Sequence, residues 1–292
     1  MSHLRLSPRN LGQLLIDPFC PRCFWYQVQM NFRLPFDRPM PGIMFHLDHF
    51  EKRIVEEHFA VEDAAPEWLR ELHLASPIDF PAKMTQEFPE YDITMVGMPD
   101  AVFLKKNGKL CLVDFKTAIC HGTDDPFMPI YETQLMGYTH LLESNNVGTV
   151  DSAALVYFEN KAKELQSHPL ELLTDDGFFM PFGVQIHEVE IDRSALEPLL
   201  IRIRKVADEE NPPTGLDKCK DCAKLQSLLD KEQKMRDYQE FCKRQRSHFR
   251  NYIYPKLSLD RQMARVAWKF DWDPDDSEPF VLPELIGLMP PA

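Results

Sequence analysis

Three short stretches decide the fold: Val96-Gly-Met-Pro-Asp100, Lys105-Lys-Asn-Gly-Lys109 and Val113-Asp-Phe-Lys-Thr117. They predict two strands joined by a tight turn around the Asn-Gly pair. A strict two-residue loop would place Asp100 and Asp114 on opposite faces of this hairpin. A three-residue loop ending at Gly108, with that glycine in the left-handed conformation, pairs Lys105 with Lys109 instead. Asp100 then lies opposite Asp114, and both carboxylates share one face.

This hairpin places the residues of a hydrolytic metal site together. Directly opposed residues have β-carbons about 5 Å apart, so Asp100 and Asp114 can bind one cation, and Lys116 projects on the same side. Carboxylates with Mg²⁺ or Mn²⁺ activate water and hold a phosphate, while a lysine stabilises the developing charge. The apolar run 110–113 indicates a buried strand that ends at these charges. The pattern therefore favours hydrolysis of phosphodiester bonds.

Two helices add candidate residues on either side of the hairpin. Apolar residues recur at helical spacing from Ile43 to Phe59, and this helix carries His46 near its start. A second helix, about Tyr131 to Glu143, places Gln134 and Tyr138 one turn apart on one face. We expect all three side chains to belong to the same site as the carboxylates.

The cysteines predict a second metal site. Four of the seven form two CxxC pairs, Cys20 with Cys23 and Cys219 with Cys222. Two such pairs supply the four sulfur ligands of a tetrahedral site, and spacing alone favours zinc ahead of an iron–sulfur cluster. Because the pairs lie at distant points of the chain, metal binding would clasp its two ends together and add to folding stability. The other cysteines, Cys111, Cys120 and Cys242, have no such partner.

The remaining pattern alternates strands and helices, which indicates an α/β protein. An N-capped helix after Ser7 is expected to lead to the first CxxC pair, followed by a proline-rich loop from Leu34 to Pro41 and the first long helix. After a polar connection containing Trp68, the expected elements are strands 91–105 and 109–116, the helix 131–143, a strand 153–158, a loop at 174–177, a strand 184–191 and a helix 194–207.

The chain changes character near Cys222, where we expect a domain boundary between residues 1–222 and 223–292. A long charged helical segment, about Ala223 to Tyr252, follows the last CxxC pair. Residues 223–253 hold eight lysines and arginines against four acidic residues, whereas the stretch after Lys269 is acidic and contains no basic residue. The basic segment could contact phosphates, and the extension is a candidate surface for protein partners.

Composition excludes several classes of protein. The chain has 292 residues, 44% of them hydrophobic, which predicts a folded protein with a sizeable core. A net charge of −13 argues against a generally basic nucleic-acid-binding surface, so any DNA contact must be local. The longest apolar run, Ala153 to Phe158, is far shorter than the roughly 18 residues of a membrane helix. We expect a soluble, cytoplasmic protein with no secretory signal and no membrane partner.

Taken in order, these motifs resemble the RecB-like branch of the PD-(D/E)XK nucleases, in particular its iron–sulfur members, the CRISPR-associated exonucleases and AddB-type nuclease domains. The resemblance covers roughly residues 7–222. It rests on Gly42-xxx-His46, Gly97-xx-Asp100, Asp114-Phe-Lys116 and Gln134-xxx-Tyr138, with the CxxC pairs before and after this core.

The resemblance implies a restriction-endonuclease-like α/β core, a central mixed sheet flanked by helices, with a four-cysteine metal clasp and a C-terminal helical extension. It implies that His46, Asp100 and Asp114 bind Mg²⁺ or Mn²⁺, that Lys116 assists attack, and that Gln134 and Tyr138 orient the substrate. It also raises a 4Fe-4S cluster above zinc, although two-plus-two cysteines depart from the one-plus-three arrangement of those members. Asp48 and Glu51 lie near enough to His46 to share or replace its role.

The function expected from this set is an exonuclease that cleaves DNA, with single-stranded ends as substrate. Two alternatives stay open. One is a catalytically silent DNA-binding or assembly subunit of a repair or defence complex. The other is a structural protein clasped by zinc, which would be colourless where an iron–sulfur protein absorbs visible light.

Overall fold

The computed structural model describes residues 3–33, 41–161 and 168–248. Two units divide the chain, residues 1–217 and 218–292, and each is described by itself. Most of the expected proline-rich loop, the end of the basic segment and the whole acidic tail lie outside the described residues.

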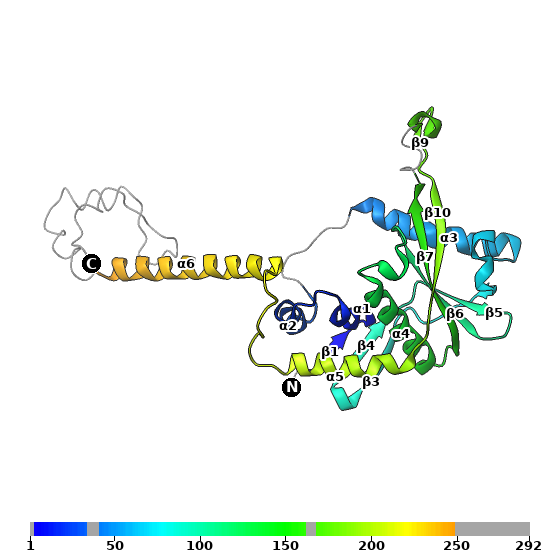
Figure 1. Ribbon diagram of the computed structural model, residues 1–292. Helices are drawn as coiled ribbons and strands as arrows, with labels where there is room; N and C mark the ends of the chain where they lie inside the picture. Colours follow the sequence, from blue (N-terminus) through cyan, green and yellow to red (C-terminus); the bar gives the residue numbers. More distant parts are fainter. Residues whose placement is uncertain (1–2, 34–40, 162–167, 249–292) are drawn as a thin grey trace. The chain divides into compact units, whose positions relative to one another are not determined.

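A five-stranded mixed sheet forms the centre of the first unit (Figure 1). Its strands are β2 (Leu74–Pro77), β5 (Ala101–Lys105), β6 (Leu110–Lys116), β7 (Val150–Asn160) and β10 (Phe182–Val189), in the order β10-β7-β6-β5-β2. Strands β6 and β7 run parallel, and the other neighbours run antiparallel. The apolar β6 strand is therefore the central one, with two strands on each side.

Two smaller sheets complete the β structure of this unit. Strands β1 (Leu4–Leu6), β4 (Ile93–Gly97) and β3 (Met84–Phe88) form a three-stranded sheet in the order β1-β4-β3. Strands β8 (Leu173–Thr174) and β9 (Gly177–Phe178) pair with each other in an excursion beyond the ends of β7 and β10 (Figure 1).

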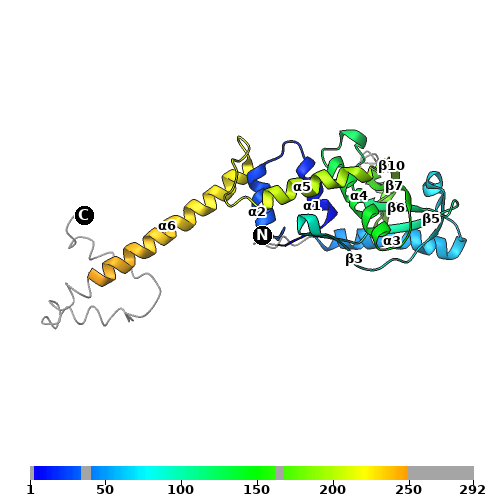
Figure 2. The same cartoon turned by 90° about the horizontal axis from the view of Figure 1, so that it is seen from below.

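Helices cover both faces of the central sheet. The α-helices of this unit are α1 (Pro8–Gly12), α2 (Pro21–Gln29), α3 (Gly42–Glu62), α4 (Met128–Ser144) and α5 (Leu196–Ala207). Short 3-10 helices span Gln13–Leu15, Glu67–Leu72, Pro89–Tyr91, Gly122–Asp124, Pro169–Leu172 and Arg193–Ala195. Helices α1, α4 and α5 lie side by side (Figure 2). Among the described residues, no helix has the length and apolar composition needed to cross a bilayer.

The core consists of two layers of apolar side chains, one on each face of the sheet. Leu110 and Leu112 of β6 pack with α1, α2, α4, α5 and the three-stranded sheet. Val113 and Phe115 point the other way and pack with Val55 of α3. This arrangement confirms the α/β fold with a central mixed sheet between helices.

The predicted register of the hairpin is confirmed. Strand pairs such as Ala101 with Val113 and Leu104 with Leu110 place Asp100 opposite Asp114 when the register is continued by one residue. The Lys105 amide donates to the Lys109 carbonyl at 2.8 Å, and Gly108 has φ +78°. A three-residue loop with a left-handed glycine is the turn that this register requires.

The prediction of one strand over residues 91–105 is wrong. Residues 93–97 form β4 in the three-stranded sheet, and residues 101–105 form β5 in the central sheet. Proline has no amide hydrogen to donate to a ladder, and Pro99 lies in the connection between these two strands. The connection places Asp100 directly before the first residue of β5.

The polar connection expected after the first long helix is also wrong in part. It contains the 3-10 helix Glu67–Leu72 together with β2 and β3. Strands β1, β2 and β3 have three to five residues each and lie at the edges of their sheets. Elements this short show too few alternations to be distinguished from loops by sequence pattern. The remaining predicted helices and strands lie within a few residues of their expected positions, whereas α2, β8 and β9 were not predicted as regular elements.

The described part of the second unit is one helix, α6 (Lys220–His248). Ion pairs one turn apart, such as Arg236 with Glu232 and Arg244 with Glu240, support it along its length. The helix begins two residues before Cys222, close to the expected change of character in the chain.

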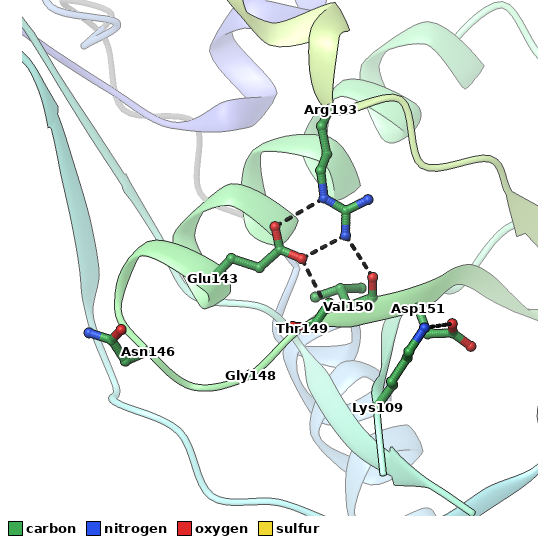
Figure 3. Close-up of a pocket in the computed structure, with 8 residues that line it drawn as sticks. All are labelled: Lys109, Glu143, Asn146, Gly148, Thr149, Val150, Asp151 and Arg193. Atoms are coloured by element: carbon green, nitrogen blue, oxygen red, sulfur yellow. Dashed lines mark hydrogen bonds and ion pairs between the residues drawn. The ribbon is translucent and has the colours of Figure 1, made fainter. Parts of the chain in front are cut away.

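A polar pocket of about 720 Å³ lies at the beginning of β6 and β7, lined by Lys109, Glu143, Asn146, Gly148, Thr149, Val150, Asp151 and Arg193 (Figure 3). Arg193 donates to both oxygens of Glu143, at 3.0 and 2.6 Å, and to the Val150 carbonyl at 2.8 Å. Lys109 pairs with Asp151 at 3.3 Å. These paired charges tie α4 to β7, so the pocket is part of the scaffold.

Candidate active site

Asp100 and Asp114 meet at the far end of the hairpin, where β6 ends. Asp114 follows Leu110 and Leu112 on the face toward α4, and it is only 2% exposed. Asp100 Oδ2 accepts a hydrogen bond from the Phe115 amide at 3.1 Å. The two carboxyl groups therefore come from adjacent strands, and each is held by the neighbouring strand or helix.

Lys116 lies on the same side of β6 as Asp114, as its spacing of two residues predicts. Its ammonium forms an ion pair with Asp114 Oδ2 and lies 4.6 Å from the centroid of the Tyr131 ring. A cation over an aromatic face is attracted by the ring, so Tyr131 of α4 helps to fix this ammonium. Only its place in the helical pattern marks Tyr131 in the sequence.

Helix α4 contributes the expected glutamine and tyrosine. Gln134 Nε2 donates to Asp114 Oδ1 at 3.0 Å and to the Tyr138 hydroxyl at 3.2 Å. Because this hydroxyl oxygen accepts a bond, its own proton remains available to an acceptor such as a phosphate. A β-carbon at residue 97 would lie 2.6 Å from Tyr138 Cε1, which is closer than van der Waals contact allows. Glycine at this position therefore leaves room for the tyrosine ring.

His46 does not join this group. It lies near the start of α3 and is exposed, and no hydrogen bond or ion pair within the described ranges connects it to Asp100 or Asp114. An α-helix turns by about 100° per residue, so nine residues place His46 on the side of α3 opposite the buried Val55. The described structure thus shows no contact between His46 and the two aspartates, and the expectation that His46 binds metal with them stays a prediction.

Helix α3 instead directs Glu51 and Lys52 toward the hairpin. Glu51 is 5% exposed, one turn before Val55, and accepts a hydrogen bond from the Thr117 hydroxyl at 2.9 Å. Lys52 Nζ lies 2.9 Å from Asp100 Oδ1. We name Glu51, Asp100 and Asp114 the carboxylate cluster. Glu51 occupies a position on the apolar face of α3. An acidic residue at such a position is the sequence signal that identifies it.

Burial raises the pKa values of Asp114 and Glu51. Asp114 has its pKa raised from 3.8 to about 6 by burial, an effect that Lys116 opposes and the charge of Asp100 reinforces. Burial likewise raises the pKa of Glu51, against the hydrogen bond from Thr117. Two negative charges close together in a buried place are unfavourable, and a bound cation would relieve them.

This shift predicts how stability depends on pH. The pKa of Asp114 is higher in the folded protein than its ordinary value. The contribution of Asp114 to the free energy of unfolding is therefore complete below about pH 4 and is lost as the pH rises through about 6. In EDTA, we expect Asp114→Asn to raise the free energy of unfolding at pH 7.5 by up to about 3 kcal/mol, since each pKa unit is about 1.4 kcal/mol. At pH 4 the variant and parent should be equally stable in denaturant titrations. An equal difference at both pH values would contradict this prediction.

The carboxylate cluster fits a hard divalent cation. Its donors are carboxylate oxygens, the ligands that Mg²⁺ and Mn²⁺ prefer. Both aspartates already carry a positively charged partner, Lys52 on Asp100 and Lys116 on Asp114. Gln134 Oε1 is buried beside Asp114 and has no hydrogen-bond partner among the described residues, so it offers one more acceptor.

The four cysteines of the two CxxC pairs also lie together, as the spacing predicts. Their sulfur atoms are all within 4.8 Å of one another. The Leu216 amide lies 3.3 Å from Cys20 Sγ, and the Cys222 amide 3.5 Å from Cys219 Sγ. Amides directed at sulfur are typical of thiolate sites that hold a metal.

Helix α2, which carries Cys23 and is N-capped by Cys20, is held in the first unit by side-chain hydrogen bonds. From α2, Trp25 Nε1 donates to the Glu209 carbonyl at 2.9 Å and Gln29 Nε2 donates to the Ala207 carbonyl at 3.1 Å. Arg202 of α5 donates to the Leu14 carbonyl at 2.8 Å. The end of α5 and the chain after it are thereby fixed beside the first CxxC pair.

Comparison with protein-family models gives a match over most of the chain. A model of the PD-(D/E)XK nuclease superfamily matches residues 20–226, a range that includes the carboxylate cluster and both CxxC pairs. A comparison with curated proteins found no match. A solved structure described as "Crystal structure of SSO0001" is 13% identical, with 73% of this chain and 80% of that chain covered and a TM-score of 0.40. The family model matches well over half of the sequence, and the chain belongs to the PD-(D/E)XK nuclease superfamily.

Proposed function

We propose that this protein is a divalent-metal-dependent nuclease that hydrolyses phosphodiester bonds of DNA, acting as an exonuclease on single-stranded ends. The observation that carries the proposal is the convergence of Asp100, Asp114 and Lys116 where β6 ends. Two carboxylates and a lysine on one face supply both a cation site and a positive group for the phosphate.

Each residue has a role that follows from its contacts. Asp100, Asp114 and Glu51 would hold Mg²⁺ or Mn²⁺, which when bound supplies an activated water and polarises the phosphate. Lys116 stabilises the charge that develops on the phosphate. Gln134 holds the Asp114 carboxyl in place, and the Tyr138 hydroxyl donates its free proton to a phosphate oxygen.

Exposed apolar side chains close in sequence to the site residues support a single-stranded substrate. Met98 is 53% exposed and precedes Asp100 by two residues, and Ile119, 55% exposed, follows Lys116 by three. Phe127, which directly precedes α4, is 51% exposed. Unpaired bases stack on apolar and aromatic side chains, whereas a duplex keeps its bases inside.

We propose further that the four-cysteine group holds a structural 4Fe-4S cluster, as in the RecB-like iron–sulfur branch. The sulfur spacing gives a specific reason to test zinc as the second candidate, because a tetrahedral ion with bonds of about 2.3 Å separates its sulfurs by about 3.8 Å. Visible absorption of anaerobically purified protein distinguishes the two, since zinc is colourless.

A cleavage assay tests the activity. Anaerobically purified protein is incubated with end-labelled single- and double-stranded DNA in Mn²⁺, Mg²⁺ or EDTA. We expect metal-dependent loss of the labelled end from single strands, and no cleavage in EDTA. If fully metal-loaded protein cleaves neither DNA nor RNA, the alternative of a silent DNA-binding subunit takes the place of this proposal.

A further inference from the structure

Lys52 is a charged residue of the site that the superfamily motifs do not account for. It follows Glu51 on α3, and its ammonium lies between two carboxylates, 2.9 Å from Asp100 Oδ1 and 3.0 Å from Asp48 Oδ2. Its side chain is 27% exposed and that of Asp100 24%, so this pair is half-buried, whereas Asp48 is 55% exposed. Lys52 thus lies between the carboxylate cluster and the solvent-exposed Asp48.

All four oxygens of the paired aspartates are engaged. Asp100 accepts the Phe115 amide on Oδ2 and pairs with Lys52 through Oδ1. Asp114 accepts Gln134 on Oδ1 and pairs with Lys116 through Oδ2. The Phe115 amide takes one of the two lone pairs of Oδ2 and cannot leave it without distorting β6. Oδ1 accepts no backbone bond, so it is the more open oxygen for a cation, and the Lys52 ammonium lies there.

We propose that Lys52 is a positioning residue that occupies the cation-binding oxygen of Asp100 and competes with the divalent ion for it. This inference rests on the proposed function, because it assumes that Asp100 binds the ion. When the ion binds, the ammonium moves off Asp100 and remains paired with Asp48, which already lies within hydrogen-bonding distance. Lys52 therefore lowers the affinity of the site for its ion and keeps the acidic site neutralised while it is empty.

Direct binding of Mn²⁺ tests the proposal without any cleavage. Free Mn²⁺ is measured by electron paramagnetic resonance during titration of full-length protein in the absence of DNA. For Lys52→Met we expect a Kd for Mn²⁺ about tenfold lower than in the parent, because a competing unit charge about 3 Å from the ligand is removed. Lys52→Gln, which keeps a polar end, should shift the Kd in the same direction and serves if the methionine variant folds poorly.

Arg53→Met is the matched control. Arg53 is the next residue on α3 and carries the same charge, but it pairs with Glu57 on the solvent side. Its removal should leave the Kd unchanged, whereas a long-range effect of charge would lower the Kd in both variants. In cleavage assays, Lys52→Met should reach half-maximal rate at a correspondingly lower Mn²⁺ concentration.

The outcomes separate this inference from the proposed function. An unchanged or higher Kd in both Lys52 variants, or an equal decrease in Arg53→Met, overturns the role of Lys52 while metal binding by the parent stands. If the parent binds no Mn²⁺, or if Asp100→Asn leaves its Kd unchanged, the metal site itself is wrong and the inference falls with it.

Discussion

Asp114→Asn is expected to lower the rate of DNA cleavage by about a thousandfold or more, because it removes a ligand charge from the most buried carboxylate of the site. Asparagine has nearly the same shape as aspartate and can still accept the hydrogen bond from Gln134. The fold should therefore persist, and the loss should be in turnover. Initial rates on end-labelled single-stranded DNA in Mn²⁺ measure the effect.

Asp151→Asn is the matched control for this experiment. Asp151 lies at the beginning of β7, where it pairs with Lys105 at 2.9 Å, at the opposite end of the sheet from Asp114. Its replacement should leave cleavage within about twofold of the parent. Lys116→Met should lose about a hundredfold in rate while retaining Mn²⁺, because the lysine acts on the phosphate. Full activity of Asp114→Asn would refute the assignment of the site.

Cys219→Ser is expected to remove the metal of the four-cysteine group and to destabilise the protein by at least about 3 kcal/mol, since binding of a structural metal contributes directly to folding. This corresponds to a decrease in Tm of roughly 10 °C in a chain of this size. Elemental analysis for iron and zinc gives the metal content, and a thermal unfolding scan gives the Tm.

Cys242→Ser provides the comparison, because Cys242 also lies on α6 but outside the four-cysteine group. It should retain the full metal content and a Tm within about 2 °C of the parent. The prediction for Cys219 fails if its serine variant keeps one metal site per chain. An equal loss of Tm in both variants would show that α6, and not the metal, is responsible.

Much of the candidate site could be predicted from sequence because its residues lie on regular elements. The hairpin register followed from one turn, since Gly108 fixes which residues of β5 and β6 are opposite each other. Gln134 and Tyr138 followed from helical spacing. In each case a short-range rule decides the geometry, and no distant contact changes it.

Sequence reasoning reaches less far where spacing along the chain does not determine direction in space. The motif points to His46, whereas helical geometry places that residue on the outer side of α3 and the buried Glu51 on the inner side. The position of Lys52 between Asp48 and Asp100 depends on a contact between α3 and the sheet. No pattern in the sequence of α3 alone reveals which strand that helix meets.

The strand that was expected to continue through Pro99 shows a different limit. Residues on both sides of Pro99 have strand-like composition, but they belong to separate sheets. Composition reports that a segment is extended, whereas its partner strands depend on long-range pairing. The short strands β1 and β3 were not predicted for the same reason. Both form by pairing with β4, and this pairing is not visible in their own sequence.

The turn between β5 and β6 has a further consequence for how this protein can change over generations. Surface turns ordinarily gain and lose residues freely, because little is packed against them. Here the three residues Lys106, Asn107 and Gly108 set the register that places Asp100 opposite Asp114. Deleting one residue would rotate Asp100 to the opposite face of the sheet. The proposed site thus depends on the length of this exposed turn as much as on its own carboxylates, although the turn contributes no side chain to that site.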